Sequence, residues 1–433
     1  MTLKILHLSD IHLGSGFSHG RTNPETGLNT RFEDFVATLS CCMDAAIEQS
    51  ADLVLFGGDA FPDATPPPVV QQAFAQQFRR LVDAQIPTVL LVGNHDQHAQ
   101  GMGGASLCIY RTLGIPGFVV GDRLETHRLE TRSGPVQVVT LPWLTRSTLL
   151  TRPETEGLSM GEVGELLLDR LRVVLEAEIR QLDATLPTVL LAHVMTDTAR
   201  FGAERFLAVG KGFTVPMSLL ARPCFDYVAL GHVHTHQVIC QHPLMVYPGS
   251  IERVDFSEEK EDKGYVMLEL AKGQAQMTFC PVPARRFQTI RADLTQTQQP
   301  NERLLKAIDA ASTTDAVVRL LYKLRADQID QLDNPAIHAA LAQAHTYTIH
   351  PELVSQLSRP RLPELRADST LEPMVALQTY LANRDDLQDI ADDMIIAAEA
   401  LIQQEPAGAF ELSDGQDVTD IDADDDDRQL RLL

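Results

Sequence analysis

Basic residues are scarce in this chain. Its 433 residues include 36 lysines and arginines against 59 aspartates and glutamates, which gives a formal net charge of −23. Proteins that bind nucleic acid by themselves usually carry a basic surface that neutralises phosphates. The composition therefore argues against a stand-alone nucleic-acid binder. A small basic patch such as Arg79-Arg80 with Arg285-Arg286 is one alternative, and we favour a partner subunit that supplies the affinity.

Long apolar runs are also missing. No window approaches 18 unbroken apolar residues, so the sequence predicts no membrane span. The chain enters a predicted strand almost at once, and we therefore expect no signal peptide. The six cysteines lack metal-site spacing, which favours free buried thiols in a reducing cytoplasm. No G-x-x-x-x-G-K-[ST] sequence occurs, so that mode of nucleotide binding is excluded.

Residue types that bind metals occur in five clusters along the first 235 residues. The clusters are Asp10 with His12, then Asp59, then Asn94 with His95 and Asp96, then His193, then His232 with His234. Each follows a short apolar run, namely LKILHL, DLVLFG, TVLLV, TVLLA and YVAL. Such runs predict buried strands, and the carboxyl ends of strands are where open α/β sheets place ligands. We therefore expect the clusters to converge.

The chemistry of these clusters favours a pair of divalent metals. Carboxylate, amide oxygen and imidazole together suit manganese, with zinc or iron as alternatives. A carboxylate such as Asp59 can bridge two metals, and two metals roughly 3.5–4 Å apart can activate a water and stabilise an in-line phosphoryl displacement. Another histidine, His7, lies inside the first predicted strand and is expected in the core. We expect His19, His98, His236 and His242 on exposed loops.

The order D-x-H, G-G-D, G-N-H-D, H and G-H-x-H resembles the calcineurin-like metallophosphoesterases over about residues 1–235. The resemblance implies an α/β fold, in which a two-layer β-sandwich flanked by helices holds two metals at one edge. The arginine that grips phosphate in phosphoprotein phosphatases is missing after Asp59. The stretch Pro248–Arg253, followed by Asp255-Phe256 and Lys263-Gly264, is instead similar to the SbcD-like DNA nucleases. With it the resemblance reaches about residue 270, and a weaker similarity continues to about residue 405.

This second resemblance implies a function and its partners. SbcD-like proteins cut double-stranded DNA from its ends and cut single strands and hairpins internally, in DNA break repair and recombination. They act with SbcC-like ATPase subunits, two nuclease chains to two ATPase chains. The alternative is a general metal-dependent phosphodiesterase or phosphatase for small substrates, which would have no need of residues 286–404. A catalytically idle scaffold is the third possibility, and the full set of ligand residues argues against it.

Motif matching also implies a role for each site residue. One metal would be held by Asp10, His12, Asp59 and His234, and the other by Asp59, Asn94, His193 and His232. His95 would be the general acid, and Asp96 would hold its imidazole in one tautomer. Pro62 stands where archaeal relatives carry a histidine and many bacterial ones an aspartate.

The pattern of elements predicts four regions. Residues 1–283 form the nuclease domain, 284–358 a small α/β capping domain, 366–405 helices that dock on the partner, and 406–433 an acidic disordered tail. The predicted elements of the nuclease domain are strands 3–8, 52–57, 88–92 and 188–192, helices 31–49, 68–84 and 160–183, and strand-rich segments after residue 236. Two strands and two helices are expected over 286–350.

Oligomer contacts are the least defined part of the prediction. The docking helices carry apolar residues at helical spacing, namely Met374, Leu377, Tyr380, Leu381, Leu387, Ile390, Met394, Ile395, Ala398 and Leu401. An ordinary helix pair of a domain is the alternative for this segment. The resemblance also implies a homodimer through helices around Val69–Ala84 and Ala105–Leu113. Their apolar residues Phe74, Phe78, Leu81, Leu107 and Ile109 fit an interface or an intramolecular core equally well.

Overall fold

The computed structural model describes residues 2–98, 104–145, 155, 157–200, 214–354, 373–382 and 391–404. Contacts divide the chain into two units, Met1–Val354 and Ser355–Leu433. The predicted boundary at residue 283 lies inside the first unit and stays a prediction. The acidic tail 406–433 lies outside the described residues.

The first of two large sheets has six strands in the order β14-β13-β1-β2-β3-β4. The strands are β1 (Leu3–Leu8), β2 (Leu53–Phe56), β3 (Thr88–Leu91), β4 (Phe118–Gly121), β13 (Gly264–Ala271) and β14 (Gln274–Pro281). β1 to β4 are parallel, and β13 pairs antiparallel with both β1 and β14. The crossovers are α1 (Thr30–Glu48), α2 (Pro68–Asp83) and α3 (Cys108–Leu113), which confirms the predicted βαβαβ opening.

The second sheet also has six strands, in the order β11-β12-β10-β7-β6-β5. They are β5 (Glu125–Thr131), β6 (Gly134–Leu141), β7 (Thr188–His193), β10 (Tyr227–Gly231), β11 (Gln237–Gln241) and β12 (Leu244–Tyr247). The four strands β12, β10, β7 and β6 are parallel. Helices α6 (Met160–Ile179) and α8 (Met217–Leu220) belong to this half, together with the short pair β8 (Met195–Thr196) and β9 (Thr214–Val215).

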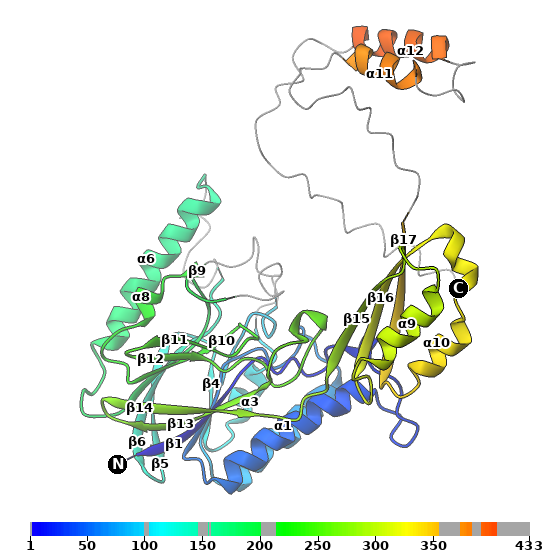
Figure 1. The fold of residues 1–433 in the computed structure, drawn as a ribbon. Coiled ribbons are helices and arrows are strands. Elements are labelled where there is room, and N and C mark those ends of the chain that lie inside the picture. The colour runs from blue at the N-terminus through cyan, green and yellow to red at the C-terminus, as the bar shows by residue number, and fades with distance from the viewer. Residues whose placement is uncertain are drawn as a thin grey trace. The chain divides into compact units, whose positions relative to one another are not determined.

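The two sheets pack face to face between layers of helices (Figure 1). Successive side chains of a strand point to opposite faces, so β1 sends Leu3 and Ile5 into the core between the sheets and Leu6 and Leu8 under α1 and α2. A third core joins the outer face of the second sheet to α6 through Leu171 and Leu175. Because the strands are buried on both faces, they are continuous apolar runs. The predicted α/β sandwich flanked by helices is confirmed.

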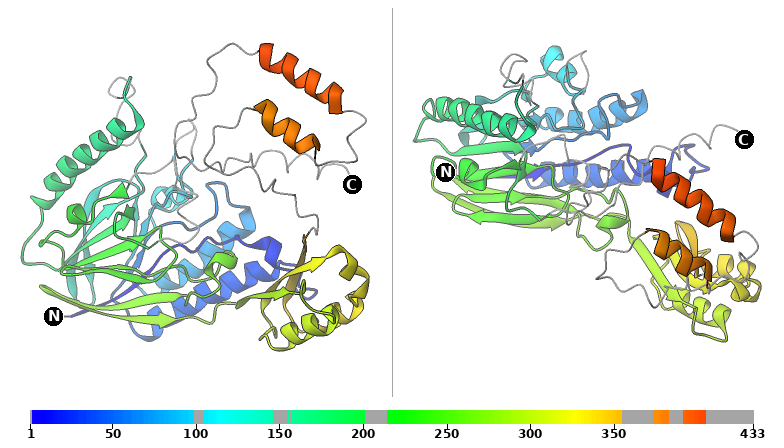
Figure 2. Two further views of the ribbon diagram at one scale, coloured as in Figure 1. Left: turned by 45° about the horizontal axis from the view of Figure 1, so that its top comes forward. Right: turned by 90° about the horizontal axis from the view of Figure 1, so that it is seen from above.

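A smaller sheet follows β14 in the same unit. Its strands β15 (Phe287–Asp293), β16 (Val317–Arg325) and β17 (Thr346–Val354) are all parallel. Helices α9 (Pro300–Asp309) and α10 (Asn334–Ala340) cover one face of this sheet, as Figure 2 shows from two further sides. β17 was not predicted, because Pro351 and polar residues interrupt its apolar pattern.

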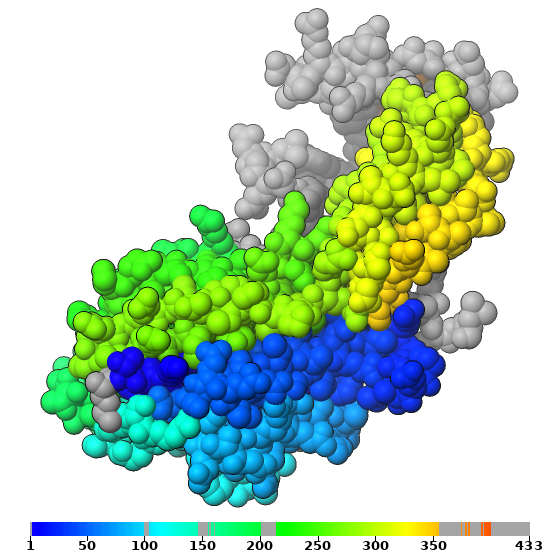
Figure 3. Space-filling model, turned by 60° about the horizontal axis from the view of Figure 1, so that its bottom comes forward, coloured from blue at the N-terminus to red at the C-terminus, as the bar shows by residue number. Residues whose placement is uncertain are grey.

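The three-stranded sheet is fixed to the N-terminal part of the sandwich by polar contacts. Arg285 forms a two-point salt bridge with Asp34 of α1, at 2.5 and 2.6 Å. The side chains of Thr30 and His345 hydrogen-bond at 2.7 Å, and the backbone oxygen of His19 accepts from Thr346. Figure 3 shows the resulting contact between the blue N-terminal segment and the yellow domain.

The second unit contains two described helices, α11 (Pro373–Ala382) and α12 (Ala391–Gln404), which contact each other. The intervening turn around Asn383 lies outside the described residues. No helix in the described part of the chain is long and apolar enough to span a bilayer.

Two expectations about buried side chains need correction. Phe74, Phe78, Leu81 and Leu107 belong to the core under the first sheet and cannot form a dimer interface. Ile109 is the member of that set that lies 53% exposed. All six cysteines are free, as expected, but Cys42 alone is fully buried and the others are partly exposed.

Candidate metal centre

The predicted clusters lie at the carboxyl ends of neighbouring strands from both sheets. Asp10 follows β1, Asp59 follows β2, Asn94 follows β3, His193 ends β7 and His232 follows β10. Backbone hydrogen bonds link the loops, from Asp10 N to Gly58 O and from His12 N to Asp59 O, both 3.0 Å. The convergence that the sequence predicted is therefore present, at one edge of the sandwich.

Asp59 lies between two groups of these side chains. Its Oδ2 atom is 3.7 Å from Nε2 of His12 and 3.4 Å from Nε2 of His193. The side chain is almost completely buried. One carboxylate oxygen thus faces a ligand atom of each group, which is the geometry that a bridging carboxylate needs.

The first group contains Asp10, His12 and His234, whose ligand atoms lie within 4.8 Å of one another. The Nε2 atoms of His12 and His234 are 3.0 Å apart. Two atoms that each bind a metal at about 2.1 Å along perpendicular directions would be separated by about 3.0 Å. This spacing fits a shared ion.

The second group contains Asn94, His193 and His232 beside Asp59. Oδ1 of Asn94 is 3.0 Å from Nε2 of His193 and 2.9 Å from Nδ1 of His232. Nδ1 of His193 donates to the carbonyl oxygen of Gly57 at 2.7 Å. In the neutral ring, Nε2 is then a lone pair that faces the acceptor oxygens of Asn94 and Asp59. A set of converging acceptors fits a cation.

Backbone conformation marks the same residues. Seven described residues other than glycine have positive φ: Asp10, His12, Ser50, Asp59, Gln85, His232 and Asp315. Four of the seven are predicted ligands. The left-handed region is costly for such residues and persists where the surroundings impose it, typically at functional sites. Gly93 is required for space as well, because a Cβ there would lie 2.1 Å from Oδ1 of Asp59.

The buried charges are strongly coupled. Burial would by itself raise the pKa of Asp59, but His193 and other nearby histidines hold it below its ordinary value. Burial would lower the pKa of His193, but the Asp59 carboxylate outweighs this and raises it to about 9. Burial raises the pKa of Asp10 to about 6. For His232, burial and the neighbouring His193 lower the pKa to about 3. The site therefore offers neutral imidazoles around an anionic Asp59.

His95 lies beside this centre with its ring anchored by Pro62. Nδ1 of His95 is 2.8 Å from the carbonyl oxygen of Pro62, and its backbone nitrogen donates to Oδ1 of Asp59 at 2.9 Å. A ligand atom of His95 also comes within 4.8 Å of those of His12 and Asp59, so the geometry alone admits it as a ligand.

The predicted role of Asp96 as the partner of the His95 ring is wrong. The Asp96 carboxylate instead accepts from the backbone nitrogens of Asp59, Ala60 and Gly93, at 2.9 to 3.1 Å. Burial and the neighbouring Asp59 raise the pKa of Asp96 to about 7, against these donors. Asp96 thus fixes the loop that carries Asp59.

Sequence reasoning missed several residues of the site. Trp143, which follows β6, packs on the ring of His232 with 4.8 Å between ring centroids. A strand-end position shared with the five clusters was the signal that could have identified it. Glu258 contacts His234, and no local motif announces this contact.

The other histidines only partly follow the prediction. His7 is buried and hydrogen-bonds the hydroxyl of Tyr227, as a core residue should. His98 and His242 are exposed as expected. His19 and His236 are partly buried, and the ring of His236 stacks on Phe279 at 4.2 Å.

Comparison with known proteins agrees with this geometry. The model of the calcineurin-like phosphoesterase family matches residues 3–236. The SbcD subunit of the nuclease SbcCD from Staphylococcus epidermidis is 25% identical over 295 residues, which cover 67% of this chain and 73% of that protein. Solved structures that align with 64% of this chain include a dimetal phosphatase from Danio rerio (TM-score 0.37, 12% identity, 99% of that chain) and a purple acid phosphatase from yellow lupin seeds (TM-score 0.38, 14% identity, 52% of that chain). Because the family model covers more than half of the sequence, this chain belongs to the calcineurin-like phosphoesterases.

Proposed function

We propose that this protein is a two-metal DNA nuclease that acts with an SbcC-like ATPase in the repair and recombination of DNA double-strand breaks. The observation that carries the proposal is the position of Asp59, one oxygen of which faces His12 on one side and His193 on the other. The similarity to a nuclease subunit named for such a complex supports DNA as the substrate and an ATPase as the partner.

Two divalent metals fit the acceptor sets, and we propose manganese. Asp10, His12, Asp59 and His234 would hold one ion, and Asp59, Asn94, His193 and His232 the other. Nε2 of His232 is buried and has no hydrogen-bond partner among the described residues, which adds an unpaired ligand atom to the second set. When bound, such a pair supplies an activated water and stabilises the oxygens of an in-line phosphoryl displacement.

The protein's own groups would handle the leaving group. A carbonyl oxygen only accepts, so the contact with Pro62 places a proton on Nδ1 of His95 and leaves Nε2 to face a substrate. In its protonated form, Nε2 can donate to the departing 3′ oxygen as a general acid. We propose this role for His95, and a supporting role for Asp96 through the Asp59 loop.

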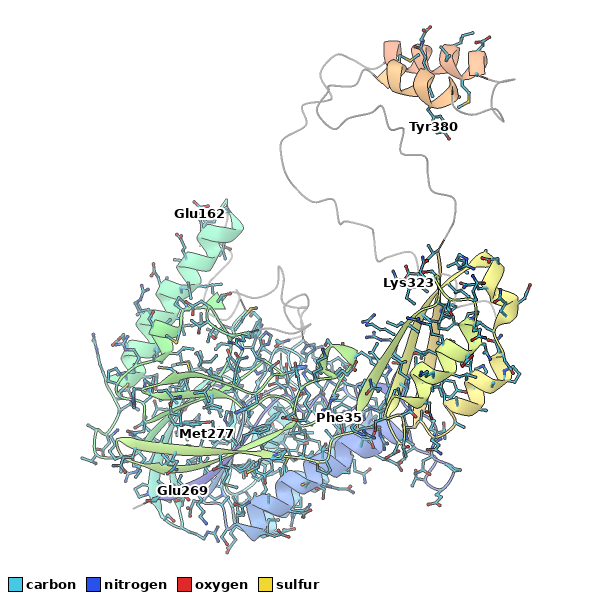
Figure 4. The ribbon with its side chains drawn as sticks, viewed as in Figure 1. Phe35, Glu162, Glu269, Met277, Lys323 and Tyr380 are labelled. Carbon is cyan, nitrogen blue, oxygen red and sulfur yellow. The ribbon has the colours of Figure 1, made fainter. Side chains whose placement is uncertain are left out.

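The region after residue 284 offers a place for a DNA backbone. Ile290, Leu320 and Tyr322 face the helices α9 and α10. The alternate residues Arg291 and Lys323 therefore lie on the opposite face of the three-stranded sheet, and both are exposed (Figure 4). We propose residues 284–358 as a capping domain that guides DNA with this face, and residues 1–283 as the nuclease domain.

The second unit provides a candidate docking element for the partner. Ile396 is 63% exposed on α12, and Tyr380 and Met394 are also exposed apolar residues. Leu387 and Ile390 of the predicted apolar set lie outside the described residues. An amphipathic helix pair can insert such residues into a groove of a partner. We propose residues 366–405 for this contact in a cytoplasmic assembly of two nuclease and two ATPase chains.

A metal-dependent nuclease assay tests the proposal. The protein, with and without the ATPase, is incubated with manganese and with linear duplex, hairpin or single-stranded DNA. Cleavage of hairpins and single strands by the nuclease alone, and ATP-dependent digestion of duplex with the partner, are expected. Rapid turnover of a phosphate monoester with no cleavage of any DNA would instead establish the alternative, a phosphatase for small substrates.

A further inference from the structure

A short acidic segment between β12 and β13 reaches the candidate metal centre. It contains the 3₁₀ helix η2 (Phe256–Glu258). Oε1 of Glu258 is 2.7 Å from Nδ1 of His234. The Glu258 side chain is almost completely buried, so this contact is shielded from water. A buried carboxylate on the outer nitrogen of a ligand ring can decide which nitrogen carries the proton.

The second oxygen of Glu258 is held by a buried lysine. Oε2 lies 2.7 Å from Nζ of Lys263, whose side chain is fully buried. Nζ of Lys263 also contacts Oε2 of Glu261 at 2.7 Å and the hydroxyl of Ser250 at 2.8 Å. The backbone nitrogen of Val254 donates to Oε2 of Glu258 at 3.1 Å. With Lys263 on one side, the Glu258 carboxylate has a fixed orientation and its other oxygen points at His234.

We propose that Glu258 is a positioning residue for the metal centre, which keeps His234 in the tautomer whose Nε2 atom presents a lone pair to a metal. The proposal rests on the proposed function, because it takes His234 to be a ligand. Nε2 of His234 faces Nε2 of His12 at 3.0 Å, so the ring already points its second nitrogen at the candidate site.

The turn that carries Glu258 is itself held by the three-stranded sheet. The Phe256 ring packs against Phe287 at the start of β15, with centroids 4.9 Å apart, and the guanidinium of Arg319 lies 4.3 Å above it. Oε1 of Glu259 accepts from the backbone nitrogen of Thr289 at 3.0 Å. Glu258 therefore transmits the position of that sheet to one ligand of the metal centre.

The substitution Glu258→Gln separates orientation from size. The amide would turn its oxygen to Lys263 and its NH₂ to Nδ1 of His234, because an ammonium needs an acceptor. The ring would then have to carry its proton on Nε2, where it blocks metal binding. We expect the affinity of the metal-stripped protein for manganese, measured by titration calorimetry, to fall by about 10- to 100-fold, as is usual when the partner of a ligand ring is lost.

Glu261→Gln is the matched control. It removes the same charge and also loses a partner of Lys263, but the contacts of Glu261 go to Lys263 and to the hydroxyl of Thr235. It should keep the wild-type affinity for manganese. An equal loss in both variants would show that charge alone matters and would overturn the proposal, as would wild-type affinity in Glu258→Gln.

His234→Ala distinguishes failure of this inference from failure of the proposed site. It should weaken manganese binding, and adding Glu258→Gln to it should cause no further loss, because Glu258 acts through the missing ring. If His234→Ala binds both metals normally, the ligand assignment is wrong and the proposal fails with it. If Glu258→Gln does not fold, nitrogen-15 NMR of the zinc-loaded wild type decides. A proton on Nδ1 of His234 is expected, and a proton on Nε2 would overturn the proposal.

Discussion

The ring of His95 hydrogen-bonds the carbonyl oxygen of Pro62 at 2.8 Å. Position 62 therefore contributes through its backbone, although its side chain has no polar atom. The contact fixes the rotation of the imidazole about its plane and assigns the proton on Nδ1, because the carbonyl cannot donate. A backbone acceptor thus supplies the orientation that motif matching had assigned to Asp96.

His95→Asn should remove DNA cleavage and leave both metals bound. A single general acid contributes roughly 10²- to 10⁴-fold in rate, so the loss should fall in that range. Rates on single-stranded DNA and metal content by elemental analysis measure the two effects. His98→Asn, three positions along the same loop and exposed, is the matched control and should behave as wild type. Loss of one metal in His95→Asn would show that His95 is a ligand.

Substitutions at Pro62 test the backbone contact. Pro62→Ala keeps the carbonyl acceptor and should keep most of the cleavage rate. Pro62→Asp adds a carboxylate next to His95, and a nearby anion favours the imidazolium. The alkaline limb of the pH–rate profile should therefore move to higher pH. An unchanged profile, or an alanine variant as inactive as His95→Asn, would contradict this role of Pro62.

Much of the centre could be predicted because its ligands come directly after apolar runs. Strand periodicity places Asp10, Asp59 and Asn94 at one edge, and the parallel topology brings His193 and His232 there as well. The partners of those ligands depend on tertiary contacts over long separations. Glu258 follows His234 by 24 residues, and Pro62 precedes His95 by 33. No periodicity or local motif encodes such pairs.

The misassigned apolar residues have a similar cause. Helical spacing shows that Phe74 and Phe78 share a face of α2, but it cannot show what covers that face. The first sheet covers it, since both rings pack near Phe56 of β2. β17 was missed because an edge strand tolerates Pro351 and needs no continuous apolar pattern.

Asp59→Asn should reduce metal loading more than Asp10→Asn. The Asp59 oxygen faces both ligand groups, whereas Asp10 belongs to one. An amide bridges two cations poorly because it lacks the negative charge. Calorimetric titration with manganese should show loss of both sites in Asp59→Asn and weakening of one in Asp10→Asn. Equal losses in the two variants would contradict the bridging role.

The metal-free protein should lose stability as the solution becomes alkaline. The folded pKa of His193, about 9, lies above its ordinary value of 6.5, because Asp59 outweighs the effect of burial. Stability from this charge is complete below pH 6.5 and is lost as pH rises through about 9. Asp96, with a pKa raised to about 7, contributes its slope at lower pH.

Urea unfolding in a chelator, followed across this pH range, measures the effect. His193→Gln should flatten the pH dependence, and saturating manganese should do the same because the metal takes the place of the proton. A metal-free wild type whose unfolding free energy is constant from pH 7 to about 9 would contradict the protonated state of His193.

Deleting residues 366–433 should abolish ATP-dependent duplex digestion and co-purification with the ATPase. The predicted ligands all lie in the unit Met1–Val354, as does Glu258, so weak manganese-dependent cleavage of single strands should survive. A shorter deletion, of residues 406–433, is the control, because it removes the acidic tail and keeps both helices. Ile396→Glu in the full chain tests the contact more finely, since it places a charge on the exposed apolar face of α12. We expect it to weaken binding of the ATPase in a pull-down without affecting single-strand cleavage. If the truncated protein binds the ATPase with full affinity, the docking surface lies in the first unit instead.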